Sequence, residues 1–205
     1  AVFQSPFVKI IRNGKALGKI ASIVNWGSNV ENSISRKLLE TTCNVHRDAS
    51  LPKFHRLTFL ETDKNKAKSV NPKAPGYGRK AVIYATCFVN YNNPSIGTSA
   101  VDVLNTNGVE TEVVYPSCCG MPQLEQGNIE DVAKAAEKVA KELRIWVDEG
   151  NDIIALTPSC ALMLKFEWPL ILPENEDVKV LSSATYDICL LYTSDAADEG
   201  LGVDL

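Results

Sequence analysis

Residues 80–87 have the sequence KAVIYATC, a short run of apolar and β-branched side chains typical of a strand buried on both faces. Two similar runs follow it, TEVVYP at residues 111–116 and DIIALT at residues 152–157. Helical segments are expected between them, over residues 95–107 and 128–149. This alternation predicts an α/β fold, with a parallel, Rossmann-like sheet and flanking helices.

Two further segments complete the predicted sheet domain. CALMLKFEW (residues 160–168) is expected to form a helix that ends at Pro169. VKVLSSATYDI (residues 178–188) is expected to supply a fourth strand and the start of a turn. The apolar faces of the helices are expected to be anchored by the three tryptophans, Trp26, Trp146 and Trp168.

The N-terminal part has a different character. Residues 1–60 are predicted to form a helical connector, because apolar side chains recur there at helical spacings. Residues 61–79 contain little to bury and several Pro and Gly residues, which indicates a linker. Residues 1–80 carry 15 Lys and Arg against 5 Asp and Glu, whereas residues 81–205 carry 6 against 20. The basic arm favours an anionic membrane face or an acidic partner, and nucleic acid is not expected because the arm contains no binding motif.

Composition excludes several classes of protein. The chain has 205 residues, of which 45% are hydrophobic, so it can bury a core and is not a disordered chain. No apolar run reaches the roughly 18–20 residues of a membrane span, and the first residues lack the apolar core of a signal peptide. The adjacent cysteines Cys118 and Cys119 do not suit a simple disulfide framework. We therefore expect a reducing, cytoplasmic location.

Four of the six cysteines follow predicted strands. Cys87 ends the first strand, Cys118 and Cys119 follow the second, and Cys160 follows the third. The carboxyl ends of parallel strands meet at one edge of a sheet, where helix N-termini favour thiolates. A single strand-end cysteine is usually a small core residue, but four at one edge indicate a metal or redox site. The remaining two, Cys43 and Cys189, lie outside this pattern.

The chemistry of such a site is that of soft thiolates, which select iron–sulfur clusters, zinc or copper(I). Gly120 follows the paired cysteines and allows the backbone to pass close to a bulky group. From the residues alone, iron–sulfur and zinc both stay open.

Three segments resemble a known family: CFVNYNNPSIG (residues 87–97), YPSCCGMPQLEQGN (115–128) and TPSCALMLKFEWP (157–169). They are similar to the cysteine-rich CCG domain found in the B-subunit of heterodisulfide reductase and in related Fe–S oxidoreductases. Among these, the resemblance is greatest to the family of the C-subunit of anaerobic glycerol-3-phosphate dehydrogenase. It covers residues 80–188, which are therefore expected to form one CCG domain.

The resemblance implies a [4Fe–4S] cluster, or its non-cubane variant, with Cys87, Cys118, Cys119 and Cys160 as ligands and Gly120 beside them. The family pattern ends in C-x-x-C, whereas this chain has Met163 at the last position. Four thiolates suffice for a cubane cluster or for zinc, whereas a non-cubane cluster needs the fifth.

The resemblance also implies a function. The chain is expected to be an iron–sulfur electron-transfer subunit of an anaerobic dehydrogenase, which takes electrons from a flavoprotein partner and passes them towards membrane quinone. FAD would belong to that partner, and the subunit would attach peripherally to the inner face of the membrane. Two alternatives stay open: a heterodisulfide or disulfide reductase subunit with a catalytic cluster, and a structural zinc-binding scaffold.

The end of the chain has a separate interpretation. Residues 189–199, CLLYTSDAADE, resemble the conceptual translation of a transposon end used in sequencing libraries. We therefore expect residues 189–205 to be a non-native tail, and the rest to be the connector and first CCG domain of a longer protein.

Overall fold

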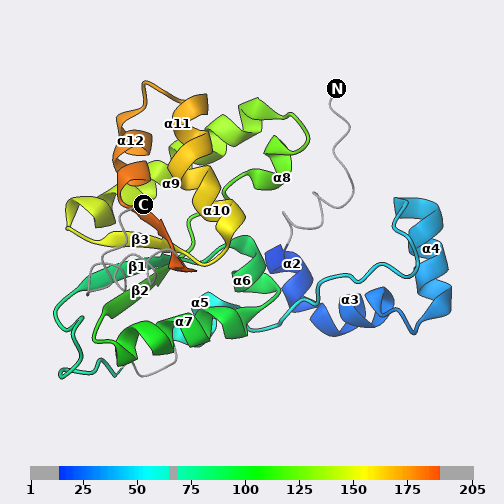
Figure 1. Cartoon of the computed structure of the whole chain (residues 1–205). Helices are drawn as coiled ribbons and strands as arrows, with labels where there is room; N and C mark the ends of the chain where they lie inside the picture. Colours follow the sequence, from blue (N-terminus) through cyan, green and yellow to red (C-terminus); the bar gives the residue numbers. More distant parts are fainter. Residues whose placement is uncertain (1–13, 65–68, 190–205) are drawn as a thin grey trace, which may run out of the picture.

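The computed structural model describes residues 14–64 and 69–189 (Figure 1). Its centre is a sheet of four parallel strands in the order β2-β1-β3-β4. The strands are β1 (Lys80–Tyr84), β2 (Glu110–Val114), β3 (Asp152–Ala155) and β4 (Thr185–Asp187). The predicted α/β fold with a parallel sheet is confirmed.

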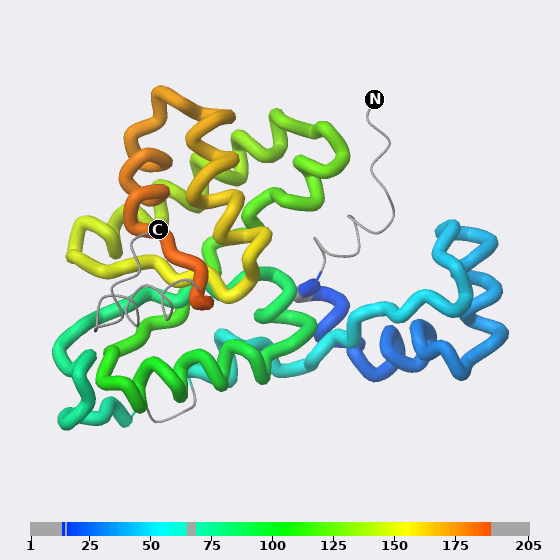
Figure 2. The backbone as a smooth tube through the Cα atoms, in the orientation of Figure 1, coloured from blue at the N-terminus to red at the C-terminus, as the bar shows by residue number. Residues whose placement is uncertain are grey.

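Helices cover both faces of this sheet (Figure 2). One face packs against the C-terminal helices, and the other against helices that precede or follow β1. On the first side are α9 (Ile129–Asp148), α10 (Pro158–Leu162), η1 (Met163–Glu167), α11 (Trp168–Ile171) and α12 (Glu176–Ser183). On the second side are α5 (Phe59–Lys64), α6 (Cys87–Tyr91) and α7 (Pro94–Thr106). The short α8 (Met121–Leu124) precedes α9.

The core divides along the pleat of β1. Val82 and Tyr84 face the cluster that contains α9, whereas Ala81 and Ile83 face the cluster that contains α7. All four are buried, because successive side chains of a strand point to opposite faces and both faces are covered. The unbroken apolar sequence of this strand is thus explained.

Two expectations near the C-terminus are wrong in detail. The helix that starts at Pro158 does not end at Pro169, because a π-helical turn at residues 163–167 leads directly into α11, which continues to Ile171. Pro169 occupies the first turn of α11, where a missing N–H is tolerated. Residues 178–183 are helical and belong to α12, so the fourth strand is limited to Thr185–Asp187.

The N-terminal helices lie beside the sheet domain (Figure 1). They are α2 (Gly14–Lys19), α3 (Ala21–Ser28) and α4 (Ser33–Cys43), and a buried arginine holds the last two to the following loop. Arg36 is 1% exposed, and its guanidinium donates to the carbonyls of Ser28, His46, Arg47 and Ala49. Trp26 is 68% exposed, so the expectation that it anchors an apolar face is wrong.

The segment predicted to be a linker begins as a packed helix. Its first residues, 61–64, belong to α5, whose Phe59 is fully buried against the sheet. The proposed domain limits 1–60, 61–79, 80–188 and 189–205 otherwise stay predictions, and residues 1–13, 65–68 and 190–205 lie outside the described part. Within the described ranges, none of the helices combines the length and hydrophobicity needed to cross a membrane.

Candidate metal centre

The four predicted site cysteines lie where the strands of the sheet end. Cys87 is the first residue of α6, after β1, and Cys160 lies in the first turn of α10, after β3. Cys118 and Cys119 lie between β2 and α8. All are free thiols, and the parallel sheet brings them to one edge although the sequence separates them widely.

Two sulfur–sulfur contacts link Cys118 to Cys87 and Cys119 to Cys160. Cys118 Sγ lies 3.7 Å from Cys87 Sγ, and Cys119 Sγ lies 3.3 Å from Cys160 Sγ. Cys119 and Cys160 are buried, with 1% and 5% exposure, whereas Cys87 and Cys118 are half-buried. The group thus has a sealed inner pair and an accessible outer pair.

The other two cysteines, Cys43 and Cys189, take part in neither of these two sulfur contacts. Cys43 is the last residue of α4, and Cys189 is exposed near the end of the described chain. Within residues 14–64 and 69–189, no three His, Cys, Asp or Glu side chains are grouped to hold a single metal ion.

The turn that carries Cys118 and Cys119 depends on the glycine after them. Gly120 has φ +88°, in the left-handed region that glycine adopts without strain, and it precedes α8. A Cβ at this position would face Val132 and Ala135 of α9 at 3.5 Å or more. The structure therefore shows Gly120 as the residue that allows the turn, and direct contact with a cofactor stays a prediction.

Two buried side chains donate hydrogen bonds to the same turn. The Tyr84 hydroxyl donates to the Ser117 carbonyl at 2.6 Å, and the Trp168 indole N–H donates to the Cys119 carbonyl at 3.1 Å. Both side chains are fully buried. Sequence reasoning missed these contacts, although a tyrosine inside an otherwise apolar buried strand signals a hydroxyl that needs a partner.

Two of these thiols, Cys87 and Cys119, favour the protonated form. The contact with Cys118 and then burial raise the pKa of Cys87, and contacts with Cys118 and Cys160 followed by burial raise the pKa of Cys119. These effects are stronger than the stabilisation of thiolates expected from helix N-termini. Two negative thiolates in contact repel each other, and burial disfavours the charged form. A bound cation would reverse this balance, since a metal deprotonates a coordinating thiol.

Two asparagines follow Cys87, one within α6 and one at its C-cap. Asn90 is buried and its Oδ1 accepts from the Leu60 amide at 3.1 Å. Asn92 donates to the Lys53 carbonyl at 2.9 Å. Both therefore connect α6 to the segment before the sheet.

The position of the missing fifth cysteine lies in the core. Met163 is fully buried in the same cluster as Cys119 and Cys160, and it is the first residue of η1. The number of thiols at this edge is therefore four.

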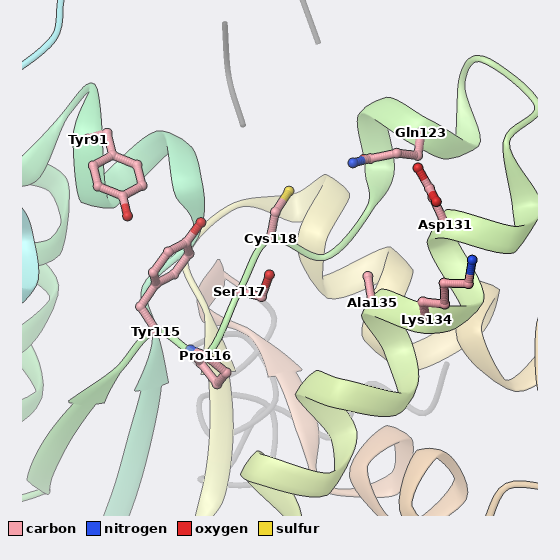
Figure 3. Close-up of a pocket in the computed structure, with 9 residues that line it drawn as sticks. All are labelled: Tyr91, Tyr115, Pro116, Ser117, Cys118, Gln123, Asp131, Lys134 and Ala135. Carbon is pink, nitrogen blue, oxygen red and sulfur yellow. The ribbon is translucent and has the colours of Figure 1, made fainter. Parts of the chain in front are cut away.

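A cavity of about 400 Å³ opens beside Cys118 (Figure 3). Cys118 lies between its two sides, with Tyr91 and Tyr115 on one and Lys134 and Asp131 on the other. The two tyrosine rings meet edge to face, with centroids 5.6 Å apart. Burial raises the pKa of both phenols, so they are neutral hydrogen-bonding groups at neutral pH.

Comparison with known proteins agrees with this site. Residues 81–165 match the family model described as the CCG cysteine-rich domain. The chain is homologous to the C-subunit of anaerobic glycerol-3-phosphate dehydrogenase from Escherichia coli (strain K12), with 29% identity over 82% of this chain and 41% of that protein.

Other relatives are more distant. Lactate utilization protein A of Bacillus pumilus is 28% identical over 53% of this chain and 46% of its own length. The B-subunit of fumarate reductase (CoM/CoB) from Methanothermobacter marburgensis is 25% identical over 74% of this chain and 32% of its own length. The chain thus spans less than half of each of these relatives, and no solved structure matches it.

The four cysteines fit an iron–sulfur group by their donor chemistry. Their thiols are soft sulfur donors, and three of them, Cys118, Cys119 and Cys160, lie in or against an apolar core, the surroundings in which thiolates hold such clusters. The CCG domain and the oxidoreductase names of the relatives also support an iron–sulfur cofactor. The identity of each ligand and the cluster type stay predictions.

Proposed function

We propose that this chain is an iron–sulfur electron-transfer subunit of an anaerobic dehydrogenase, with Cys87, Cys118, Cys119 and Cys160 as cluster ligands. The observation that carries the proposal is the pair of thiol contacts, Cys118 with Cys87 and Cys119 with Cys160, at the carboxyl edge of a parallel sheet. When bound, a cluster would supply one-electron chemistry that no side chain provides.

The chain's own residues would hold that group and limit its contact with water. The buried pair Cys119 and Cys160 would form the inner attachment. Cys87 and Cys118 would be the more exposed ligands, and Cys118 would face the cavity. An accessible outer side suits a subunit that exchanges electrons with partners.

The partners follow from homology and charge. Similarity to the C-subunit of anaerobic glycerol-3-phosphate dehydrogenase supports a place in a dehydrogenase with several subunits. The family resemblance implies a flavoprotein donor that carries FAD, and transfer towards membrane quinone. The excess of Lys and Arg in residues 1–80 supports peripheral attachment to the anionic inner face of the membrane from the cytoplasm. Cosedimentation with anionic vesicles should weaken as salt rises, and binding that ignores ionic strength would contradict the electrostatic attachment.

The test of the cofactor is anaerobic purification with quantification of iron, sulfide and zinc, together with an EPR spectrum. Cys119→Ser should remove or alter the cluster signal, whereas Cys43→Ser, in α4, should leave it unchanged. Four iron atoms per chain would support the [4Fe–4S] assignment. Zinc without iron, retained after cluster reconstitution, would replace the redox function with a structural zinc scaffold.

The cavity beside Cys118 favours a second candidate, a disulfide reductase subunit. Cleavage of a disulfide to two thiols would consume two electrons from the reduced partner and two protons, and it needs room for a substrate next to the cluster. Ala135→Leu should narrow this cavity while leaving all four cysteines in place. Loss of disulfide turnover in this variant, with an unchanged EPR spectrum, would favour the reductase, and absence of turnover in the wild type would favour electron transfer alone.

A further inference from the structure

The turn that carries Cys118 and Cys119 is held by two buried donors from different elements. The Ser117 carbonyl comes just before Cys118 and the Cys119 carbonyl just after Cys119, and each accepts one side-chain hydrogen bond. Tyr84 donates from β1 and Trp168 from α11, and both belong to the same core cluster. We propose that Tyr84 and Trp168 are positioning residues that fix the Cys118–Cys119 turn and thereby set the properties of the cluster. This inference rests on the proposed cluster function.

Because both donors are buried, the loss of either hydrogen bond would leave a polar group without a partner. Tyr84 and Trp168 have 0% exposure, so water cannot replace the hydrogen bonds if the turn moves. A buried polar group that loses its partner costs more than an exposed one. The turn is therefore confined to the position at which both carbonyls are satisfied.

The π-helical turn explains how α11 reaches the cysteines. Cys160 and Trp168 are eight residues apart, and in a regular α-helix such a pair points in different directions, because 3.6 residues make one turn. The π-helical turn η1, at residues 163–167, lies between them, and a π turn contains about one residue more than an α-helical turn. The two positions then behave as a pair seven residues apart, which share a helix face.

The contacts agree with this register. Cys160 Sγ meets Cys119 Sγ at 3.3 Å, and Trp168 Nε1 meets the Cys119 carbonyl at 3.1 Å. One helix therefore supplies a sulfur and an indole donor to the same residue. Neither this indole nor the Tyr84 hydroxyl is bonded to a sulfur in these contacts, so both would act on the cluster through the backbone.

The orientation of the ligand sulfurs and their surroundings tune the reduction potential of an iron–sulfur cluster. If the Ser117 or the Cys119 carbonyl lost its hydrogen bond, the turn could shift and water could enter near Cys118. We expect the cluster to remain assembled in such variants, but with a changed midpoint potential and faster loss of iron.

The test uses Tyr84→Phe and Trp168→Phe in the anaerobically purified, cluster-loaded chain. Tyr84→Phe removes one oxygen atom only. The matched controls are Tyr186→Phe in β4 and Trp146→Phe in α9, which make the same chemical changes away from the turn. The measurements are the EPR spectrum, the midpoint potential and the rate of iron release to a chelator.

We expect both variants to change the EPR spectrum and the potential, and to raise the rate of iron release about fivefold, as the loss of one hydrogen bond allows. The controls should match the wild type. Potentials and release rates of Tyr84→Phe and Trp168→Phe that equal those of the controls would overturn the inference. A wild-type chain that binds no iron after reconstitution would instead overturn the proposed function.

Discussion

The hydroxyls of Thr86 and Thr157 lie 2.9 Å apart and connect the ends of β1 and β3. Thr86 also caps α6, where its Oγ1 accepts from the Val89 amide at 3.3 Å, and Cys87 is the first residue of that helix. Thr157 is the N-cap residue of α10, which carries Cys160. One polar contact therefore links the starts of the two helices that present these cysteines.

Thr157→Val should destabilise the protein, because the substitution removes a hydroxyl and leaves fully buried Thr86 without that partner. We expect a loss of about 1–2 kcal/mol in the free energy of unfolding, measured with denaturant. Thr106→Val removes an exposed hydroxyl and should change stability by less than about 0.5 kcal/mol. The double variant with Thr86→Val should cost less than the sum of the single changes, and simple additivity would show that the two hydroxyls are not coupled.

Gly120→Ala and Gly27→Ala should have opposite effects on stability. Gly120 has φ +88°, so a side chain there strains the backbone, and we expect a loss of about 1–2 kcal/mol. Gly27 lies in α3 with open space around its Cβ position, so alanine should stabilise the helix by about 0.5–1 kcal/mol. Thermal or chemical unfolding of both variants tests this pair, and a stabilising Gly120→Ala would contradict the left-handed turn.

The metal-free, reduced protein should lose stability as the pH rises above the thiol pKa of the unfolded chain, which is about 8.5. Folding raises the pKa of Cys87 and Cys119, so the unfolded state releases protons at a lower pH than the folded state. The stabilisation is therefore complete below that pH, and each such thiol lowers stability by up to about 1.4 kcal/mol per pH unit above it. Denaturant unfolding at several pH values measures the slope.

A matched pair of variants separates these thiols from other groups that titrate at high pH. Cys119→Ser should flatten the slope because serine does not titrate in this range, while Cys43→Ser should leave it unchanged. Equal slopes in both variants would contradict the raised pKa of Cys119.

Arg36→Met should loosen the N-terminal helices without affecting the sheet domain. The substitution removes the guanidinium that four carbonyls accept from, and these acceptors are then left without their charged donor. We expect the opening free energy of α3 and α4 to fall by at least about 2 kcal/mol, which hydrogen exchange measures segment by segment. Exposed Lys37→Met is the control, and unchanged exchange in residues 21–49 of the Arg36 variant would contradict the stabilising role.

Much of the site was determined by the sequence itself. The apolar runs at β1 and β3 and the amphipathic pattern of α9 are local signals, and their alternation leaves a parallel sheet as the simplest solution. Since parallel strands present their carboxyl ends at one edge, the spacing of the cysteines was enough to predict that Cys87 and Cys160 would meet Cys118 and Cys119.

The tertiary structure alone decided how that edge is built. The π-helical turn, the helical start of the predicted linker and the solvent-exposed Trp26 all depend on which long-range partner is available, and no local pattern records this. For the same reason, the sequence could not reveal that Tyr84 and Trp168 bind two carbonyls of the turn that carries Cys118. Hydrophobic periodicity determines which face of an element is buried, whereas the partner of a buried polar atom is determined only when the elements pack together.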